Sequence, residues 1–154
     1  MNKLLLLLLL LFSHYVLAEP PTIQYDMSQS KNWKKDTSQV IHIGTKCSGI
    51  FDAVIWRLSS DKRPKMLEMT KKYRMYGDVF MYTTGALAEK TGVSSEFFTK
   101  KYKYWMDLYK AQGEQNHIKY NDFFQGQLGD DFKTCSGIVP FFETLLTAMA
   151  KEKN

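Results

Sequence analysis

The two cysteines are the residues best suited to covalent chemistry. Cys47 and Cys135 each open the same four-residue sequence, Cys-Ser-Gly-Ile. Two thiols can form a structural disulfide, work as a redox pair, or ligate a metal. The Cys-x-x-Cys spacing typical of a redox pair is absent, and His42 and His117 stand at no recognisable metal-ligand spacing. We therefore predict a structural disulfide Cys47–Cys135, with a distant redox pair or two buried free thiols as the alternatives.

A glycine follows each cysteine two residues later, at Gly49 and Gly137. Within a helix a glycine costs about 1 kcal/mol relative to alanine, so we interpret both as points of close approach between helices. A bridge at these positions would join two helices near their N-terminal turns, which requires the helices to run parallel or to cross there. In the chain-entropy model, closing a loop of about 89 residues removes about 4.6 kcal/mol of freedom from the unfolded chain.

The elements that must position these cysteines are helices. After residue 37, apolar residues recur at steps of three and four in four separate stretches. The stripes begin at Cys47, Met66, Phe98 and Ile138 and run to Leu58, Leu87, Tyr109 and Met149. A less regular stretch, residues 123–128, predicts a short fifth helix. The expected fold is therefore all-α, a helical bundle of four main helices plus a short fifth, with one disulfide.

Residues typical of helix ends separate the stripes. The expected ends and caps are Pro64, Gly92, Ser94 or Ser95, Gly113, and Asp130 or Asp131. Pro140 falls inside the last stripe, where it either kinks the helix or marks a start just before it.

The segment before the first stripe has a different composition. Residues 19–36 are polar, open with two prolines and show no helical stripe. We expect an extended N-terminal arm, pinned against the body by Tyr25 and Trp33. Residues 37–154 are then a single helical domain.

The first eighteen residues have the three parts of a secretory signal peptide. Lys3 precedes the apolar run of residues 4–12, and Val16 and Ala18 occupy the −3 and −1 positions of a cleavage site before Glu19. The run is shorter than the ~20 residues of a membrane-spanning helix, although an uncleaved anchor is an alternative. We predict residues 1–18 to be a signal peptide, no membrane-spanning segment in the mature chain, and a periplasmic or secreted protein.

Aromatic residues form 14% of the chain, enough to line a ligand pocket. Two helices carry most of them at helical spacing, and such stripes are either core or the wall of a site for an apolar ligand. The candidate pocket residues are Tyr73, Tyr76, Phe80, Tyr102, Trp105 and Tyr109.

The formal net charge of +5 raises the question of an anionic partner. Lysines cluster at residues 100–103 and at residues 71–74, each time beside a tyrosine, a composition found in nucleic-acid binders. An exported protein seldom meets nucleic acid, so we expect no nucleic-acid partner and interpret the clusters as solvated helix faces. Weak contact with an anionic surface is the functional alternative.

Residues for catalysis are scarce. The chain has no Gly-rich phosphate loop, no Gly-x-Ser-x-Gly and no His-Glu-x-x-His, so no cofactor or metal is predicted. Asp52 and Asp107 stand off the apolar faces of their helices, and we expect neither to be desolvated. His42 could approach Cys47 as a thiolate–imidazolium pair, which leaves a thiol-dependent enzyme as a minority hypothesis.

The leading functional prediction is a non-catalytic exported helical protein that binds a protein partner in the cell envelope. The first alternative is a carrier of an apolar small molecule in an aromatic-lined bundle interior. As a small helical protein with a predicted export signal and one predicted disulfide, the chain superficially resembles periplasmic acid-stress chaperones, which are shorter and differ in cysteine context. That resemblance implies a chaperone-like activity as a further alternative.

Overall fold

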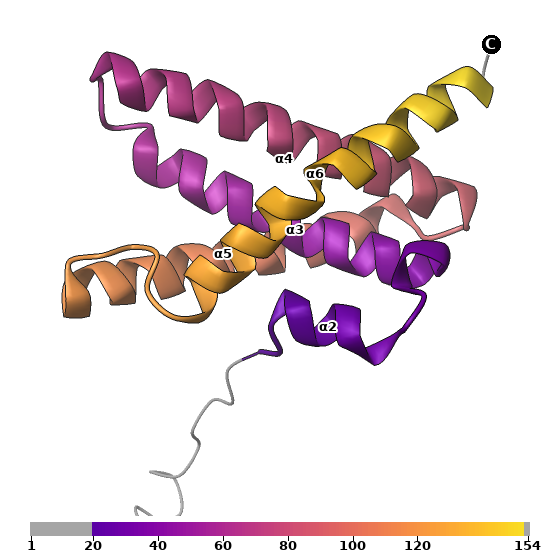
Figure 1. The fold of residues 1–154 in the computed structure, drawn as a ribbon, viewed down its shortest axis with the longest axis horizontal. Helices are drawn as coiled ribbons and strands as arrows, with labels where there is room; N and C mark the ends of the chain where they lie inside the picture. Colours follow the sequence, from indigo (N-terminus) through magenta and orange to yellow (C-terminus); the bar gives the residue numbers. More distant parts are fainter. Residues whose placement is uncertain (1–19, 153–154) are drawn as a thin grey trace, which may run out of the picture.

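The computed structural model describes residues 20–152, which fold into helices without any strand. The elements are α2 (Ile23–Gln29), the 3₁₀ helix η1 (Trp33–Lys35), α3 (Thr37–Leu58), α4 (Pro64–Lys90), α5 (Ser95–Tyr120) and α6 (Gln127–Glu152) (Figure 1). The all-α class, the four main helices and the disulfide are confirmed. The predicted signal peptide lies outside the described residues. None of the described helices is long and apolar enough to cross a membrane.

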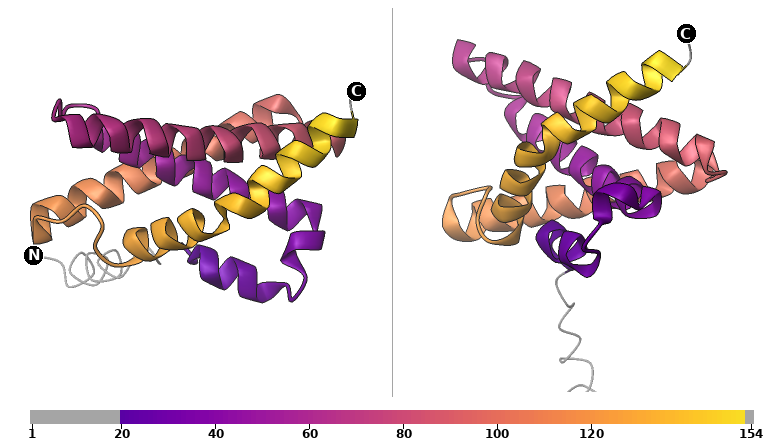
Figure 2. Two further views of the ribbon diagram at one scale, coloured as in Figure 1. Left: turned by 45° about the horizontal axis from the view of Figure 1, so that its top comes forward. Right: turned by 45° about the vertical axis from the view of Figure 1, so that its right-hand side comes forward.

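Helix α3 lies at the centre of the molecule. Helices α4, α5 and α6 all cross it, and α2 packs beside its first half (Figures 1 and 2). Every residue from 43 to 51 is buried, on all sides of the helix. A helix buried all round must be covered by several neighbours, because a surface helix hides only one stripe. Any polar side chain in this stretch therefore needs a partner from an adjacent helix.

The disulfide joins α3 to α6 where the two helices cross. Cys47 and Cys135 are fully buried, and their Cα atoms lie 5.4 Å apart. The bridge lies at the middle of α3 and beyond the first two turns of α6, so the prediction of a bridge near their N-terminal turns is wrong. The reason is that α3 begins at Thr37, where the Asp36 carboxylate accepts hydrogen bonds from the Ser38 and Gln39 amides.

Most of the described part of the N-terminal arm is helical, in α2 and η1, so the prediction of an extended arm is wrong for those residues. The Thr22 hydroxyl caps α2 by accepting a hydrogen bond from the Tyr25 amide, 3.0 Å away. A helix this short shows no clear stripe and depends on contacts with the rest of the fold. Trp33 is buried edge-on against Phe141, with 5.2 Å between ring centres, whereas Tyr25 is 53% exposed and pins nothing.

The short fifth helix is α2 rather than residues 123–128. There the chain turns, with Gly126 at a φ of +59°, and α6 begins at Gln127. Helix α5 also continues past Gly113 to Tyr120, so the prediction that it ends near Gly113 is wrong. Gly113 is a point of close approach, because the ring of Phe123 fills the space that a side chain there would need. The end of α5 is Asn121, in the left-handed conformation.

The other helix ends are mostly as expected. Pro64 starts α4, Gly92 follows its end with a φ of +75°, and the Ser94 hydroxyl caps α5. Helix α6 continues through Pro140. Asp131 lies inside α6 rather than at its cap, and it is buried. This burial places a carboxylate in the core.

Candidate functional site

The two glycines beside the cysteines differ in their surroundings. A Cβ atom on Gly49 would lie 2.8 Å from the backbone nitrogen of Met106 and 2.9 Å from Trp105 Cβ, so α3 and α5 approach closely there. Nothing lies within 4 Å of a Cβ on Gly137, which faces solvent. The expectation of close approach is therefore wrong for Gly137. The helix that approaches α3 at Gly49 is α5, whereas the disulfide joins α3 to a different helix, α6.

The six aromatic residues expected to line one pocket lie in two separate groups. On α4, Phe80 is buried and Tyr73 and Tyr76 are half-buried, and all three pack around Phe51 with ring centres 5.5 to 6.0 Å apart. On α5, Trp105 and Tyr109 stack at 6.1 Å, and Tyr102 is half-buried nearby on the same helix. Among the described residues, no ring contact joins the two groups. The structure therefore does not bring the six together around one cavity.

A buried lysine is the main feature that the sequence patterns missed. Lys46 has no exposed surface, and its ammonium lies 2.6 Å from the Asp26 carboxylate of α2. The same ammonium donates a hydrogen bond to the Pro21 carbonyl oxygen at 2.7 Å and lies 4.5 Å from the Trp105 ring centre. A buried charge needs such partners, because an unpaired one would carry a large desolvation penalty. Lys46 therefore ties α3 to α2 and to α5.

A second buried carboxylate, Asp131 of α6, lies beside the start of α2. One of its oxygens accepts a hydrogen bond from the Ile23 amide at 2.7 Å, and the other accepts from the Tyr109 hydroxyl at 2.9 Å. Burial raises the pKa of Asp131. Burial, and then the negative charge of Asp131, raise the pKa of Tyr109, which keeps the phenol protonated as a donor. Gln127, one turn before Asp131, donates to the Pro20 carbonyl oxygen at 2.6 Å.

Two signals in the sequence could have indicated this cluster. Asp131 stands four residues before Cys135, so a helix that buries the cysteine places the aspartate on the same face. Lys46 is adjacent to Cys47 in a stretch rich in small and apolar residues, where a helix covered on all sides leaves no solvated face. The sequence patterns alone gave no indication that Asp26 would be the partner of Lys46, because that pairing depends on where α2 docks.

His42 connects this cluster to the surface. Its Nε2 atom lies 3.3 Å from the Asp26 carboxylate, and 26% of its side chain is exposed. Burial lowers the pKa of His42, the Asp26 charge opposes that effect, and Lys101 and Lys46 reinforce it. Cys47, the expected partner of His42 in a thiol-dependent enzyme, is fully buried and disulfide-bonded.

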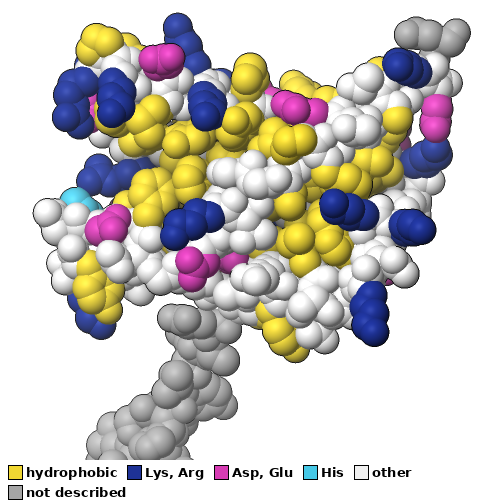
Figure 3. Space-filling model, viewed as in Figure 1, with side chains coloured by type: hydrophobic (Ala, Val, Ile, Leu, Met, Phe, Trp, Pro, Cys, Tyr) yellow, Lys and Arg dark blue, Asp and Glu magenta, His cyan; other side chains and the backbone are white. Residues whose placement is uncertain are grey.

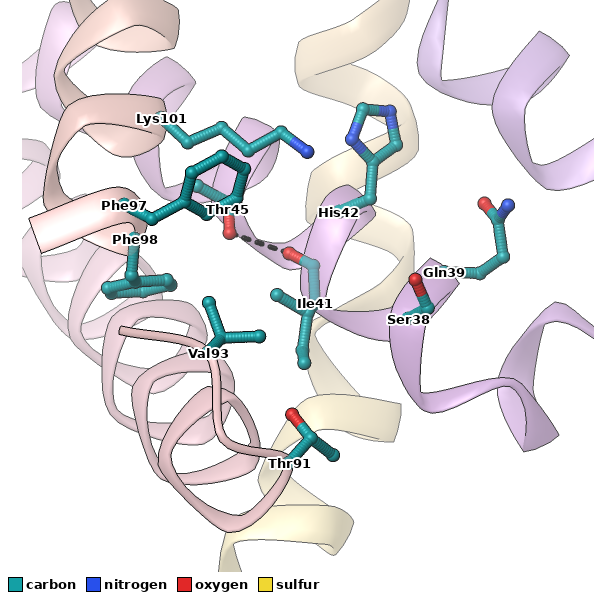
Figure 4. A pocket seen from close by; sticks show the side chains of 10 residues that line it. All are labelled: Ser38, Gln39, Ile41, His42, Thr45, Thr91, Val93, Phe97, Phe98 and Lys101. Atoms are coloured by element: carbon teal, nitrogen blue, oxygen red, sulfur yellow. Dashed lines mark hydrogen bonds between the residues drawn. The ribbon is translucent and has the colours of Figure 1, made fainter. Parts of the chain in front are cut away.

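The exposed side of His42 lines a groove of about 490 Å³ between α3, the turn after α4, and α5. We call this the His42–Lys101 groove. Its lining residues are Ser38, Gln39, Ile41, His42 and Thr45 of α3, Thr91 and Val93 of the turn, and Phe97, Phe98 and Lys101 of α5 (Figure 4). Figure 4 shows the Lys101 side chain reaching across the groove towards His42, with Ile41, Val93 and Phe98 below. One end thus carries a cation and the other is apolar.

Lys101 is available to bind an anion. Among residues 20–152 it takes part in none of the ion pairs, whereas its neighbour Lys100 pairs with Glu96 at 2.8 Å. Its ammonium lies 5.6 Å from the ring centre of Phe97, which is 57% exposed. A second hollow of about 480 Å³ shares Val93 and Phe98 with the groove, so the depression extends along the start of α5.

One further carboxylate departs from expectation. Asp52 is half-buried and accepts a hydrogen bond from the Tyr102 hydroxyl, which joins α3 to α5. Burial, and then the charge of Asp78, raise the pKa of Asp52, so the expectation that it stays solvated is wrong. Asp107 is exposed, as expected. The contact between Asp52 and Tyr102 links two helices without facing the groove.

On the face shown in Figure 3, apolar side chains are exposed between α4 and α6, and Lys and Arg lie around the rim.

No protein-family model, curated protein or solved structure matches this chain. The function is therefore inferred from the groove, the buried cluster and the surface.

Proposed function

We propose that this chain is a non-catalytic binding protein of an exported compartment. In this proposal the His42–Lys101 groove recognises a segment of a protein partner that presents an apolar side chain next to a carboxylate. The observation that carries it is the combination, in one open groove of about 490 Å³, of an apolar floor and a cation, Lys101, that forms no ion pair within residues 20–152. The buried disulfide supports the choice of compartment, because such bonds persist in oxidising surroundings.

The surface around the groove supports a partner larger than a small molecule. Phe97, Lys101 and Tyr104 follow one another at steps of four and three along α5, so they share a face of the helix. Phe97 is 57% exposed and Tyr104 is 56% exposed. Exposed aromatic residues beside a cation are typical anchors of protein interfaces. A partner segment seated in the groove would cover these side chains as well.

The packing of the centre favours surface recognition over an internal carrier. The interior around α3 is filled by Phe51, Phe80 and Phe142, which have no exposed surface, and the Phe80 ring contacts the other two. The volume of the groove does lie within the range of about 300–1,000 Å³ found for small-molecule sites. An apolar carboxylate such as dodecanoate is therefore the second candidate ligand, at the same site.

The test uses fluorescent peptides that pair one Leu or Phe with one Asp or Glu, and matched peptides in which Lys replaces the acid. The acidic peptides should bind saturably, and Lys101→Glu should weaken that binding at least tenfold. Lys119→Glu, at the far end of α5, is the matched control for charge and should bind as the unchanged protein does.

Two outcomes would contradict the proposal. Equal losses in Lys101→Glu and Lys119→Glu would show that only the overall charge of the protein matters. Binding of dodecanoate without binding of any acidic peptide would favour the carrier alternative.

A further inference from the structure

Residues 20–29 contact the rest of the protein in the way that a bound peptide contacts its receptor. Three main-chain groups of this segment are held by side chains of the body. The Pro20 carbonyl accepts from Gln127, the Pro21 carbonyl accepts from Lys46, and the Ile23 amide donates to Asp131, at 2.6, 2.7 and 2.7 Å. Receptors for extended peptides use such bonds for affinity, since every sequence offers main-chain groups.

Two side chains of the segment add specificity. Ile23 is completely buried, and three residues later the Asp26 carboxylate pairs with Lys46 and His42. Gln24, Tyr25 and Ser28, by contrast, are exposed. The segment is thus recognised through its main chain and one apolar-x-x-acid pair.

The groups that hold the segment are also held by the body itself. Asp131 accepts a hydrogen bond from Tyr109 of α5, and the Lys46 ammonium lies over the ring of Trp105. The disulfide fixes α3 to α6, the two helices that supply Lys46 and Asp131. The cleft therefore keeps its shape through contacts that do not involve α2.

The segment, in turn, cannot be stable by itself. Helix α2 has seven residues, which is far below the length at which an isolated helix is stable in water. Among the described elements its main chain packs against α3, α6 and η1, and residues 31 and 32 of the connecting turn are exposed. Its position therefore depends on the cleft.

We infer that the cleft between α3, α5 and α6 is a segment-binding site, specific for peptides with an apolar residue and an aspartate three residues later. In this structure the protein's own residues 20–29 occupy it and dock reversibly. The site is distinct from the His42–Lys101 groove, although His42 contributes to both, and the inference goes beyond the proposed function.

The test cuts the folded protein after Ser30, at a protease recognition sequence introduced into the exposed turn. A fluorescent synthetic peptide with the sequence of residues 20–30 is then added, and its binding is followed by anisotropy. The peptide should exchange into the cut protein, and Asp26→Asn or Ile23→Ala in the peptide should weaken binding at least tenfold. A Gln24→Ala peptide is the control, since Gln24 is exposed, and it should bind equally well. Lys119→Glu in the protein, at the far end of α5, should leave peptide binding intact and controls for overall charge.

Equal binding of the Asp26→Asn peptide would overturn the inference, as would unfolding of the protein on cutting. Hydrogen exchange on the uncut chain gives a second readout. The Ile23 and Asp26 amides should exchange at least a hundredfold faster than that of Phe51 in α3. Equal protection would show that α2 opens only when the whole protein unfolds, and would also overturn the inference.

Discussion

Two sides of the central helix α3 are buried equally but are built from different chemistry. On one side Lys46 has no exposed surface and meets Asp26, the Pro21 carbonyl and Trp105. On the other side Phe51, equally buried, meets a set of aromatic rings, those of Tyr73, Tyr76, Phe80 and Phe132. Burial alone therefore says little about what a position tolerates.

The difference lies in how each side responds to the loss of one partner. Apolar packing loses free energy in proportion to the area and volume removed, so a smaller side chain weakens it gradually. A buried charge pair fails when either member is removed, because the remaining charge has lost its compensation. The polar side thus specifies which segment docks there, and the apolar side supplies bulk stability. Substitutions on each side of α3 test this difference between the charge pair and the apolar packing, from the largest expected effect to the smallest.

Removing the disulfide should have the largest effect, because it joins the helices that form both sides. The double variant Cys47→Ala, Cys135→Ala should lose about 4–5 kcal/mol of unfolding free energy by the chain-entropy model. Denaturant unfolding without reductant measures the change, and the unchanged protein after reduction is the comparison. A loss below about 1 kcal/mol would show that the crossing of α3 and α6 holds without the bridge.

Truncating one side at a time should separate the two chemistries. Lys46→Met should cost about 3–5 kcal/mol, since it leaves the Asp26 carboxylate without its main partner. Phe51→Leu keeps an apolar side chain of similar bulk and should cost about 1–2 kcal/mol. Both are measured by denaturant unfolding at pH 7. Equal costs would remove the proposed distinction between the two sides.

The two glycines beside the cysteines offer a matched pair. Gly49→Ala should destabilise by about 1–3 kcal/mol, because the new methyl group meets the α5 backbone. Gly137→Ala has open space and should stabilise by about 0.5–1 kcal/mol through helix propensity. Thermal unfolding of the two variants should therefore shift in opposite directions. A shift of the same sign in both would contradict the close approach at Gly49.

The smallest effect is a pH dependence confined to the polar side. The pKa of His42 is lowered from its ordinary 6.5 by burial, despite the opposing charge of Asp26. The unfolded chain therefore binds a proton at a higher pH than the folded protein does. The unfolding free energy is highest above pH 6.5 and falls as the pH drops from 6.5 through the lowered pKa of His42. His42→Gln should remove this part of the slope in unfolding free energy against pH. Phe51→Leu should lower the whole curve without changing its slope, and an unchanged slope in His42→Gln would contradict the prediction.

Much of the fold could be predicted from the sequence, because periodicity and end signals are local. The apolar stripes, Pro64, Gly92 and Ser94 indicate where the long helices lie, and two cysteines after a predicted export signal indicate one disulfide. Helix α2 could not be predicted in this way, since seven residues give no periodicity and its stability comes from the cleft. Pro140 did not decide between a kink and a late start.

The candidate site was harder to predict, because its residues come together only through tertiary packing. The aromatic stripes correctly indicated side chains that pack inward, but the side of α3 on which each helix lies was not determined by spacing. Lys46 and Asp131 resemble ordinary solvated or capping residues until the neighbouring helices are placed. The groove depends on the turn at Thr91 and Val93, and a stripe pattern carries no information about such a turn.

The pair of Asp26 and Lys46 is the contact on which the docking of the N-terminal helix depends, and a double-mutant cycle measures it most directly. The unfolding free energies of the unchanged protein, Asp26→Leu, Lys46→Met and the double variant give the coupling between the two side chains. Each single variant should be strongly destabilised, and the double variant should recover much of the loss, with a coupling of about 2–3 kcal/mol. Effects that add to within about 0.5 kcal/mol would show that the two residues act independently, and would contradict a charge pair that holds α2 in its cleft.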